Sequence, residues 1–318
     1  MPTEPIDPNP PLFIVINVRS GNRDTERTVD ALREVFEQAG RAHRFISPEG
    51  SQTIVDAARR AVRQAQDCNG VVVAAGGDGT INGVAQAVLG SGCVFGVIPL
   101  GTFNLFARTH GIPLEPAEAA QVLIRGLPQP VQAGKVNDHV FLVNASLGLY
   151  SNLLEDREAF KAQLGRSRLV AAGAGLRSLF REHRQLRLRL DQDGRMRSVR
   201  TPSLFVGNNR LQLDRLGVDE APLVEQGRLV ALVVRAIGTV ALLGLAMRGA
   251  LGRLGETENI LRLPTRDLTV AVGRRRRIKV AVDGEILTLG APLRFAVADT
   301  PLMLLKPLPQ PLPEPDAA

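Results

Sequence analysis

Short apolar runs alternate with helical patterns through the first part of the chain. Two such runs, residues 12–16 and 71–75, are each short enough to form one strand, and a short second strand is predicted at residues 43–46. Apolar residues between them recur at helical spacing, and a further helix is predicted from Pro116 to Gly126. Strands that alternate with helices imply right-handed crossovers and a mostly parallel sheet.

After about residue 130 the pattern changes to strands joined partly by turns. Strands are predicted at residues 135–136, 140–146, 186–190, 203–206, 229–234, 268–272, 277–282, 286–289 and 293–297. Helical stretches are predicted around 152–164 and 169–180. This pattern indicates a mainly antiparallel, β-rich second domain.

A chain of 318 residues is long enough for two domains. We therefore expect an α/β N-terminal domain over residues 1–129 and a β-rich domain over residues 130–298. The remaining segment, 299–318, is expected to pack back on the first domain, although its proline-rich end favours an extended, frayed conformation.

The charge balance of the chain favours an anionic partner. Its 39 Lys and Arg residues against 32 Asp and Glu give a formal net charge of +7. A nucleotide, an anionic lipid surface or a nucleic acid would each be attracted to a chain of that charge. The charge could equally reflect an arginine-rich composition with no particular partner. Aromatic residues make up 4% of the chain, which leaves few stacking platforms for single-stranded nucleic acid. We therefore expect no nucleic-acid partner.

Two segments are candidates for contact with a membrane surface. The run Arg274–Arg277 falls between two predicted strands, so we expect a hairpin turn there, either solvated or near anionic lipid. Residues 236–254 are rich in leucine and small residues, with Arg248 and Arg253 near the end. A buried helix that covers the sheet of the second domain is the favoured interpretation of that segment.

The sequence predicts a cytoplasmic protein that is at most peripheral to the inner face of the membrane. The segment 1–11 lacks a basic stretch followed by an apolar one, so no signal peptide is expected. The leucine-rich uncharged segment 236–247 is shorter than the about 20 residues that span a bilayer. Cys68 and Cys93 show no metal-ligand spacing, and both are expected on the core side in a reducing cytosol.

The stretch Val71–Asn82 combines an apolar run, a turn with three glycines and the start of a helical pattern. A strand that delivers such a turn to a helix N-terminus points backbone N–H groups at a phosphate. Gly76, Gly77 and Gly79 are expected to supply positive φ and close backbone approach. Asp78 repels phosphate, so its presence suggests metal or proton chemistry beside the phosphates.

Other turns follow predicted strands in the same way. Val97–Asn104 is a second strand followed by a glycine-containing turn, the polar turn Asn17–Asn22 follows the first strand, and Ser47 follows the second. In a parallel α/β sheet these turns lie at the carboxyl ends of the strands, where ligands bind.

Taken together, these motifs resemble the diacylglycerol kinase catalytic-domain family, which includes bacterial lipid kinases and sphingosine kinases and is related to NAD kinases. The resemblance covers nearly the whole chain. The stretches that carry it are Asn17–Gly21, Gly76–Asn82, Pro99–Arg108, Asn144–Gly148 and Val282–Glu285. It implies a nucleotide-binding function for the first domain and a lipid-substrate function for the second.

The activity that the resemblance implies is ATP-dependent phosphorylation of a hydroxyl on diacylglycerol or a related lipid at a membrane surface, with Mg²⁺. By resemblance, Glu285 is the base that takes the proton from the acceptor hydroxyl. Asp78 organises magnesium and phosphate or shares the role of base, and other metal ligands stay unassigned. The residues implied to line the nucleotide and its phosphates are Asn17, Ser20, Gly21, Ser47, Gly76, Gly77, Asp78, Gly79, Thr80, Ile81, Asn82 and Thr102.

Three positions depart from the family pattern. Val18 replaces the usual proline, Leu105 replaces an acidic residue, and Gln226 stands where an acidic residue contributes to a structural metal site. Because Gln226 lacks the charge that a hard cation prefers in its ligands, the presence of that metal site is an open question.

Alternatives remain open from the sequence alone. The acceptor could be a soluble molecule such as NAD, and a non-catalytic nucleotide- or lipid-binding protein could keep the same fold. Asp283–Gly284 is also typical of an ordinary hairpin turn, and Asn104 could simply cap the helix that follows it. The identity of the lipid and the oligomeric state, for which a homodimer is one alternative, do not follow from the sequence.

Overall fold

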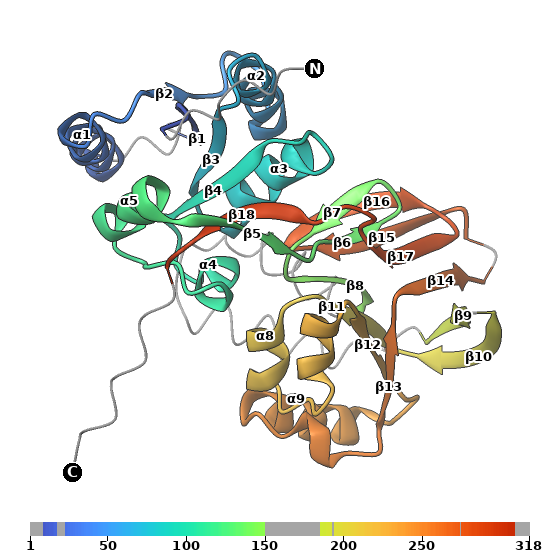
Figure 1. The fold of residues 1–318 in the computed structure, drawn as a ribbon. Helices are drawn as coiled ribbons and strands as arrows, with labels where there is room; N and C mark the ends of the chain where they lie inside the picture. Colours follow the sequence, from blue (N-terminus) through green and yellow to red (C-terminus); the bar gives the residue numbers. More distant parts are fainter. Residues whose placement is uncertain (1–8, 18–22, 150–184, 193, 274, 309–318) are drawn as a thin grey trace, which may run out of the picture. The chain divides into compact units, whose positions relative to one another are not determined.

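The chain contains two compact units. The computed structural model describes residues 9–17, 23–149, 185–192, 194–273 and 275–308. Unit 1 comprises residues 1–131 and 300–318, and unit 2 comprises residues 132–299 (Figure 1). The helical stretches predicted at 152–164 and 169–180 lie outside the described residues, as does most of the proline-rich tail.

Unit 1 is built on a six-stranded sheet with the strand order β2-β1-β3-β4-β18-β5. The first five strands in that order run parallel, and β5 is antiparallel to β18, so the expected mostly parallel sheet is confirmed. The strands are β1 (Leu12–Ile16), β2 (His43–Ile46), β3 (Val71–Gly76), β4 (Val94–Pro99), β5 (Leu127–Val131) and β18 (Leu302–Lys306). The central strands β1 and β3 are buried along nearly their whole length, which explains their continuous apolar sequence.

Helices cover both sides of this sheet. They are α1 (Arg23–Gln38), α2 (Ile54–Gln66), α3 (Asp78–Val88), α4 (Leu105–Thr109) and α5 (Pro116–Arg125). Helix α1 packs beside α5, and α2 packs beside α3 (Figure 1). Helix α2 begins with a reciprocal cap, because the Thr53 hydroxyl accepts from the Asp56 N–H and the Asp56 carboxylate accepts from the Thr53 N–H.

Unit 2 contains two antiparallel six-stranded sheets. The first has the order β10-β9-β14-β17-β6-β7, and the second has the order β13-β12-β11-β8-β15-β16. The strands are β6 (Gly134–Val136), β7 (His139–Phe141), β8 (Asn144–Gly148), β9 (Leu186–Gln192), β10 (Arg195–Thr201), β11 (Ser203–Gly207), β12 (Leu229–Val234), β13 (Ile260–Thr265), β14 (Asp267–Val272), β15 (Arg277–Val282), β16 (Glu285–Gly290) and β17 (Leu293–Val297). One apolar cluster joins residues of both sheets, so the sheets pack face to face and the β-rich second domain is confirmed.

Two short α-helices lie on the second sheet, α8 (Arg210–Arg215) and α9 (Thr239–Ala250). Leu242 and Leu245 of α9 are buried in a cluster with residues of β12, as expected for a helix that covers a sheet. The opposite side of this segment exposes Met247 and Leu251. Within the parts of the chain that the structure describes, no helix has the length and hydropathy needed to cross a membrane.

The arginine run is not in a hairpin turn. Strand β14 belongs to the first sheet of unit 2 and β15 to the second, so the segment around Arg275 and Arg276 crosses between sheets. The prediction was wrong because two strands adjacent in sequence are commonly paired, whereas here each pairs with other strands. Cys68 also differs from expectation: Cys93 is buried, but Cys68 follows the end of α2 and is exposed.

Candidate functional site

The carboxyl ends of four neighbouring parallel strands bring most of the predicted site residues of unit 1 to one edge of the sheet. In the ladder Val15 pairs with Ile46, and Ile16 pairs with Ala75. Gly76 of β3 pairs with Pro99 of β4. The residues that follow these strand ends include Asn17, Ser47, Gly77 to Asn82, and Thr102. Ser20 and Gly21 lie outside the described residues.

The turns after β3 and β4 pack against each other through their glycines. A Cβ atom added to Gly101 would lie 2.6 Å from the Gly77 Cα and 2.8 Å from the Asn104 Oδ1. The Leu100 N–H donates to the Gly76 carbonyl over 2.9 Å, which ties the two turns together at their bases. This approach of backbone to backbone leaves no room for a side chain at Gly101.

The glycines after β3 do not have the positive φ that the sequence suggested. Gly77 has φ −80° and ψ −179°, which is extended backbone, and Gly79 lies within α3. The strand passes into the helix through a single extended residue, so no left-handed turn is needed. Gly76 is required for space instead, because a Cβ there would lie 2.6 Å from the Thr80 side chain.

The N-terminus of α3 presents backbone N–H groups at this edge. The Ile81 N–H donates to the Gly77 carbonyl over 3.0 Å and is the donor of the first α-helical hydrogen bond. The N–H groups of Asp78, Gly79 and Thr80 precede it, so they have no acceptor within the helix. Gly77 at the N-cap position has no side chain with which to cap them. Together with the helix dipole, these donors favour an anion.

Asn104 closes the turn after β4 but does not cap α4 with its side chain. Its backbone is left-handed, with φ 49° and ψ 44°, and it is 4% exposed. The side-chain amide donates to the Gly101 carbonyl over 2.8 Å, and its Oδ1 accepts from the Gly101 N–H over 3.1 Å. The amide therefore fixes Gly101 against Gly77.

Asp78 reaches from α3 to the start of α4. Its Oδ1 accepts from the Phe106 N–H over 3.4 Å, so the carboxylate serves one of the N–H donors that begin α4. The contact holds one carboxylate oxygen beside the second turn. The predicted metal- and phosphate-organising residue is thus positioned by the same two turns that carry the glycines.

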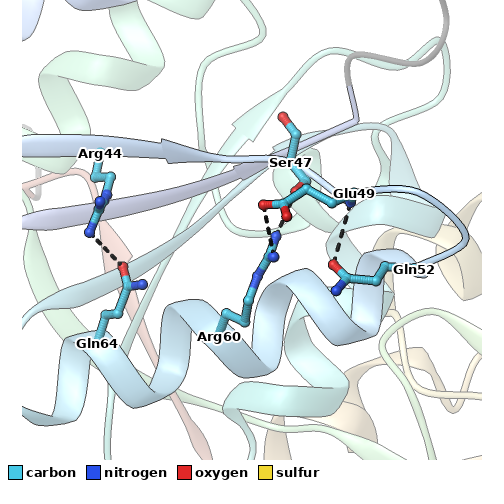
Figure 2. A network of polar contacts seen from close by, with 6 residues as sticks. All are labelled: Arg44, Ser47, Glu49, Gln52, Arg60 and Gln64. Atoms are coloured by element: carbon cyan, nitrogen blue, oxygen red, sulfur yellow. Dashed lines mark hydrogen bonds and ion pairs between the residues drawn. The ribbon is translucent and has the colours of Figure 1, made fainter.

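A polar network holds the backbone at Ser47. The Arg60 guanidinium donates to the Ser47 carbonyl over 2.7 Å and to the Glu49 carboxylate over 2.9 Å. Figure 2 shows the Ser47 hydroxyl pointing away from this arginine, while Gln52 accepts from the Glu49 N–H. Arg60 thereby fixes the loop after β2 and leaves the hydroxyl outside the network.

Glu285 is the first residue of β16 in unit 2 and is exposed. It follows a two-residue turn in which Asp283 has φ 46° and Gly284 has φ 92°. Both values are typical of a type I′ hairpin, so the hairpin interpretation of Asp283–Gly284 holds for the backbone.

Asp283 does more than form a turn. Its carboxylate accepts from three consecutive backbone N–H groups, those of Leu142, Val143 and Asn144, over 2.7, 2.9 and 2.8 Å. The Asp283 N–H also donates to the Asn144 carbonyl over 2.9 Å. These bonds anchor the hairpin that carries Glu285. They also explain why the single strand predicted over 140–146 is divided into β7 and β8.

His110 lies directly after α4 and is half-buried. Burial, together with the nearby Lys306 ammonium, lowers the pKa of His110 from 6.5 to about 3. Its ring lies edge-on to Phe106, with ring centroids 4.6 Å apart. The imidazole is therefore neutral near pH 7 and acts as a packing group beneath the turn.

The region of Gln226 contains an ion pair. The Glu225 carboxylate accepts from the Arg210 guanidinium, which also lies 3.4 Å from the Asp214 carboxylate. Among the residues that the structure describes, no group of three or more His, Cys, Asp and Glu side chains is arranged to hold a metal ion.

Sequence reasoning missed the parts of the site that work through backbone contacts. Three contacts are of this kind. The Asn104 amide bonds to the Gly101 backbone, the Asp283 carboxylate anchors the hairpin of Glu285, and Arg60 donates to the Ser47 carbonyl. The asparagine and aspartate at turns were visible signals, but their partners are distant in sequence or belong to the backbone. No sequence pattern indicated the contact between Arg60 and the Ser47 carbonyl.

Comparison with known proteins gives consistent relatives. The family model described as the diacylglycerol kinase catalytic domain matches residues 11–136. A protein named probable lipid kinase YegS-like from Pseudomonas aeruginosa strain PAO1 is 31% identical over 317 residues, which cover 96% of this chain and 97% of the relative. The diacylglycerol kinase of Bacillus subtilis strain 168 is 36% identical over 146 residues, which cover 45% of this chain and 47% of the relative.

The fold has solved counterparts as well. The crystal structure of a diacylglycerol kinase from Bacillus anthracis strain Sterne matches with a TM-score of 0.71 and 20% identity, over 93% of this chain and 97% of that one. At that identity the likeness concerns the fold. The chain spans about half the length of several curated relatives that it matches, with 52% of a Serratia proteamaculans relative and 47% of the Bacillus subtilis kinase covered.

Proposed function

Because the chain belongs to the diacylglycerol kinase catalytic-domain family, we propose that it is an ATP-dependent lipid kinase. It transfers the γ-phosphate of ATP to a hydroxyl of diacylglycerol or a related lipid. The observation that carries this proposal is the pair of packed glycine turns in unit 1, with the uncapped N-terminus of α3 and the Asp78 carboxylate beside them.

The nucleotide binds at the carboxyl edge of the sheet in unit 1. The N–H groups at the start of α3 receive the phosphates, and the contact between Gly77 and Gly101 keeps side chains out of their way. The proposed lining is the set expected from the family resemblance: Asn17, Ser20, Gly21, Ser47, Gly76 to Asn82, and Thr102. Of these, Ser47 has a braced backbone and an outward-pointing hydroxyl (Figure 2).

The chemistry of Asp78 fits a magnesium ion bound together with nucleotide. Mg²⁺ is usually held through one or two carboxylates plus substrate phosphates, so a single positioned carboxylate suffices. When bound, the ion would neutralise charge on the phosphates. Asp78 keeps its position through the Phe106 N–H, and its carboxylate retains acceptor capacity beyond that one bond.

Glu285 acts as the general base. The acceptor hydroxyl oxygen attacks the γ-phosphorus, its proton passes to the Glu285 carboxylate, and ADP leaves. An exposed carboxylate at the start of a strand is accessible to an acceptor, and the bonds of Asp283 keep the hairpin from shifting. A positioned base of this kind contributes typically 10²–10⁴-fold to the rate.

The site of action is the inner face of the cytoplasmic membrane, where the chain would bind peripherally. Three features support this part of the proposal: the lipid kinases among the relatives, the net charge of +7, and an acceptor that resides in a bilayer.

Transfer of label tests the proposal. The purified protein is incubated with γ-labelled ATP, Mg²⁺ and vesicles that contain diacylglycerol, and a parallel reaction contains NAD in place of the lipid. Label in the extracted lipid is expected. Label in NAD would show that the acceptor is a soluble molecule rather than a lipid. An absence of label in both acceptors, with the protein folded, would contradict the kinase proposal.

A further inference from the structure

The β9–β10 hairpin forms one edge of the first sheet of unit 2 (Figure 1). Three of its arginines lie on the face that points away from the core. Leu188 and Leu190 of β9 are buried in the core between the sheets. The alternating Arg187 and Arg189 are exposed and therefore point away from that core. Arg200 of β10 pairs directly with Arg187, which places it on the same face.

The arrangement of these arginines is unfavourable for the isolated sheet. Like charges directly opposite each other on neighbouring antiparallel strands destabilise the pair. Within the described parts of the chain, Arg187, Arg189 and Arg200 have no ion pair and no side-chain hydrogen bond, whereas Arg294 in the same sheet is paired with Asp267. Charges on the edge strand β10 can serve to prevent edge-to-edge association, but β9 is an inner strand, so that role does not explain its arginines.

A hollow lies among these side chains. Its volume is about 410 Å³, and its lining includes Arg187, Arg189, Ser198, Arg200 and Gly273. Gly273 has φ 50°, and a Cβ placed there would meet nothing within 4 Å, so the rim is open on that side. Guanidinium groups bind phosphate oxygens through paired hydrogen bonds, and the Ser198 hydroxyl adds a further donor.

An exposed apolar side chain lies on the same face. Met196 is 65% exposed, and its position in β10 puts it on the side of Ser198 and Arg200. The neighbouring crossover adds the exposed Arg275 and Arg276. A soluble phosphate ester would use the arginines and leave Met196 in water. A bilayer surface offers both phosphate groups and an apolar region.

We propose that Arg187, Arg189 and Arg200, hereafter the hairpin arginines, bind the phosphate groups of anionic phospholipids at a bilayer surface. Met196 enters the interfacial region beside them. This binding is a separate property from phosphoryl transfer, because it involves neither the glycine turns of unit 1 nor Glu285. Bound anionic lipid would relieve the repulsion between Arg187 and Arg200.

Co-sedimentation with vesicles tests the proposal. The protein is mixed with vesicles of phosphatidylcholine, with and without phosphatidylglycerol, at low and high salt. Each arginine near an anionic surface contributes roughly a fivefold gain in partitioning, so the Arg187→Gln/Arg189→Gln/Arg200→Gln variant should partition on the order of a hundredfold less onto phosphatidylglycerol vesicles. High salt should remove most of the difference.

A matched control separates the site from the net charge. The Arg59→Gln/Arg63→Gln/Arg125→Gln variant removes the same charge from exposed positions on α2 and α5, and it should lose far less binding. Equal losses in the two variants, or no loss in the hairpin variant, would overturn the proposal. A triple Arg→Lys replacement of the hairpin arginines keeps the charge but loses the paired guanidinium hydrogen bonds, so its binding should lie between that of the wild type and that of the glutamine variant.

Two further arms identify the source of the phosphate and separate this proposal from the kinase proposal. Glycerol 3-phosphate should compete poorly with vesicles, and displacement at equal phosphate concentration would point to a soluble ester and contradict the bilayer assignment. With a short-chain, water-soluble diacylglycerol, the hairpin variant should keep wild-type turnover. If the hairpin variant loses vesicle binding but keeps turnover, the hairpin site is supported. If the wild type has no turnover at all, the kinase proposal fails, but its vesicle binding can still be measured and tests the hairpin site independently.

Discussion

Gly101 shows how a single residue can determine the shape of the proposed phosphate site. The turn after β4 meets the turn after β3 so closely that a methyl group at Gly101 would contact the Gly77 backbone at 2.6 Å. The steric requirement for glycine is weaker at position 77, because a Cβ on Gly77 would lie 3.4 Å from the Gly101 Cα. The two glycines therefore differ in how much they tolerate.

We expect Gly101→Ala to destabilise unit 1 by about 1–3 kcal/mol, since backbone and the Asn104 amide must both move to admit the methyl group. Gly77→Ala is the matched control: its φ of −80° is allowed for alanine and its Cβ has space. The measurement is the free energy of unfolding in urea. Equal destabilisation by the two substitutions would contradict the described packing.

His110 gives the stability a dependence on pH. Its pKa is lowered to about 3 in the folded chain, so between pH 6.5 and 3 the unfolded chain binds a proton that the folded chain does not. The free energy of unfolding therefore falls as the pH drops below about 6.5, by roughly 1.4 kcal/mol per pH unit at most.

The matched measurement compares wild type with His110→Gln by urea unfolding at several pH values. Relative to the variant, the wild type should lose about 2 kcal/mol between pH 7 and pH 5. A difference that stays constant over this range would show that His110 titrates normally in the folded chain.

Single-residue chemistry was partly readable from the sequence. The glycines at 76, 77 and 101 and the acid at 78 stood out by type and spacing, but their conformations did not: extended backbone replaces the expected positive φ. The need for glycine at position 101 comes from the packing of two turns that are separated in the sequence. The role of Asn104 could not be read because a helix cap and a turn-closing amide use the same residue type.

At the scale of elements, the β15–β16 hairpin depends on the Asp283 carboxylate. The backbone N–H groups of residues 142–144 all donate to this carboxylate. When the carboxylate is removed, these three donors lose that acceptor. Hydrogen bonds to charged groups contribute more than neutral ones, and a buried donor without an acceptor is costly.

We expect Asp283→Ala to destabilise unit 2 by about 2–5 kcal/mol, with Asp283→Asn intermediate because asparagine tolerates the positive φ and keeps one acceptor oxygen. Glu285→Gln in the same hairpin serves as the control and should lower the free energy of unfolding far less, because that side chain is exposed. Comparable stability of Asp283→Ala and wild type would rule out the anchoring role.

The β9–β10 hairpin should show the opposite behaviour. Arg200→Glu converts a like-charge pair with Arg187 into an opposite-charge pair, so the free energy of unfolding should rise by about 0.2–1 kcal/mol at low salt. Arg125→Glu, in the last turn of α5, makes the same change in net charge and should not raise the stability, because the C-terminal end of the helix dipole disfavours a negative charge. A loss of stability in Arg200→Glu would show that Arg187 and Arg200 do not repel each other.

Most elements were predictable where burial imposes a pattern. The strands β12, β15 and β17 match the predicted ranges because their apolar residues face a core. Strand β10 was missed because its exposed side chains carry no apolar alternation, and β13 because Pro264 interrupts an otherwise strand-like run. The tertiary environment, rather than local sequence, makes these segments strands.

At the scale of the whole molecule, the change of pattern near residue 130 coincides with the passage from a parallel sheet to antiparallel sheets. The chain returns to unit 1 at its end, where β18 lies between β4 and β5. The assignment of nucleotide to unit 1 and lipid acceptor to unit 2 stays a prediction, as does the role of each site residue.

Glu285→Gln tests the division of roles between the units. Turnover with diacylglycerol should fall by about 10²–10⁴-fold, because the base is lost, while the affinity for ATP with Mg²⁺ stays at the wild-type value. Asp78→Asn should instead weaken Mg²⁺-dependent binding of ATP. Steady-state kinetics and equilibrium titration separate the two effects, and unchanged turnover in Glu285→Gln would remove that residue from the role of base.

The location of the phosphate site is tested most directly by hydrogen–deuterium exchange of the unmodified protein, with and without ATP and Mg²⁺. The N–H groups of residues 78–80 have no acceptor within α3, so they should exchange rapidly in the free protein. The account predicts that nucleotide slows exchange at residues 78–80 and in the turn after β4. Unchanged exchange there, with protection elsewhere on binding, would contradict it.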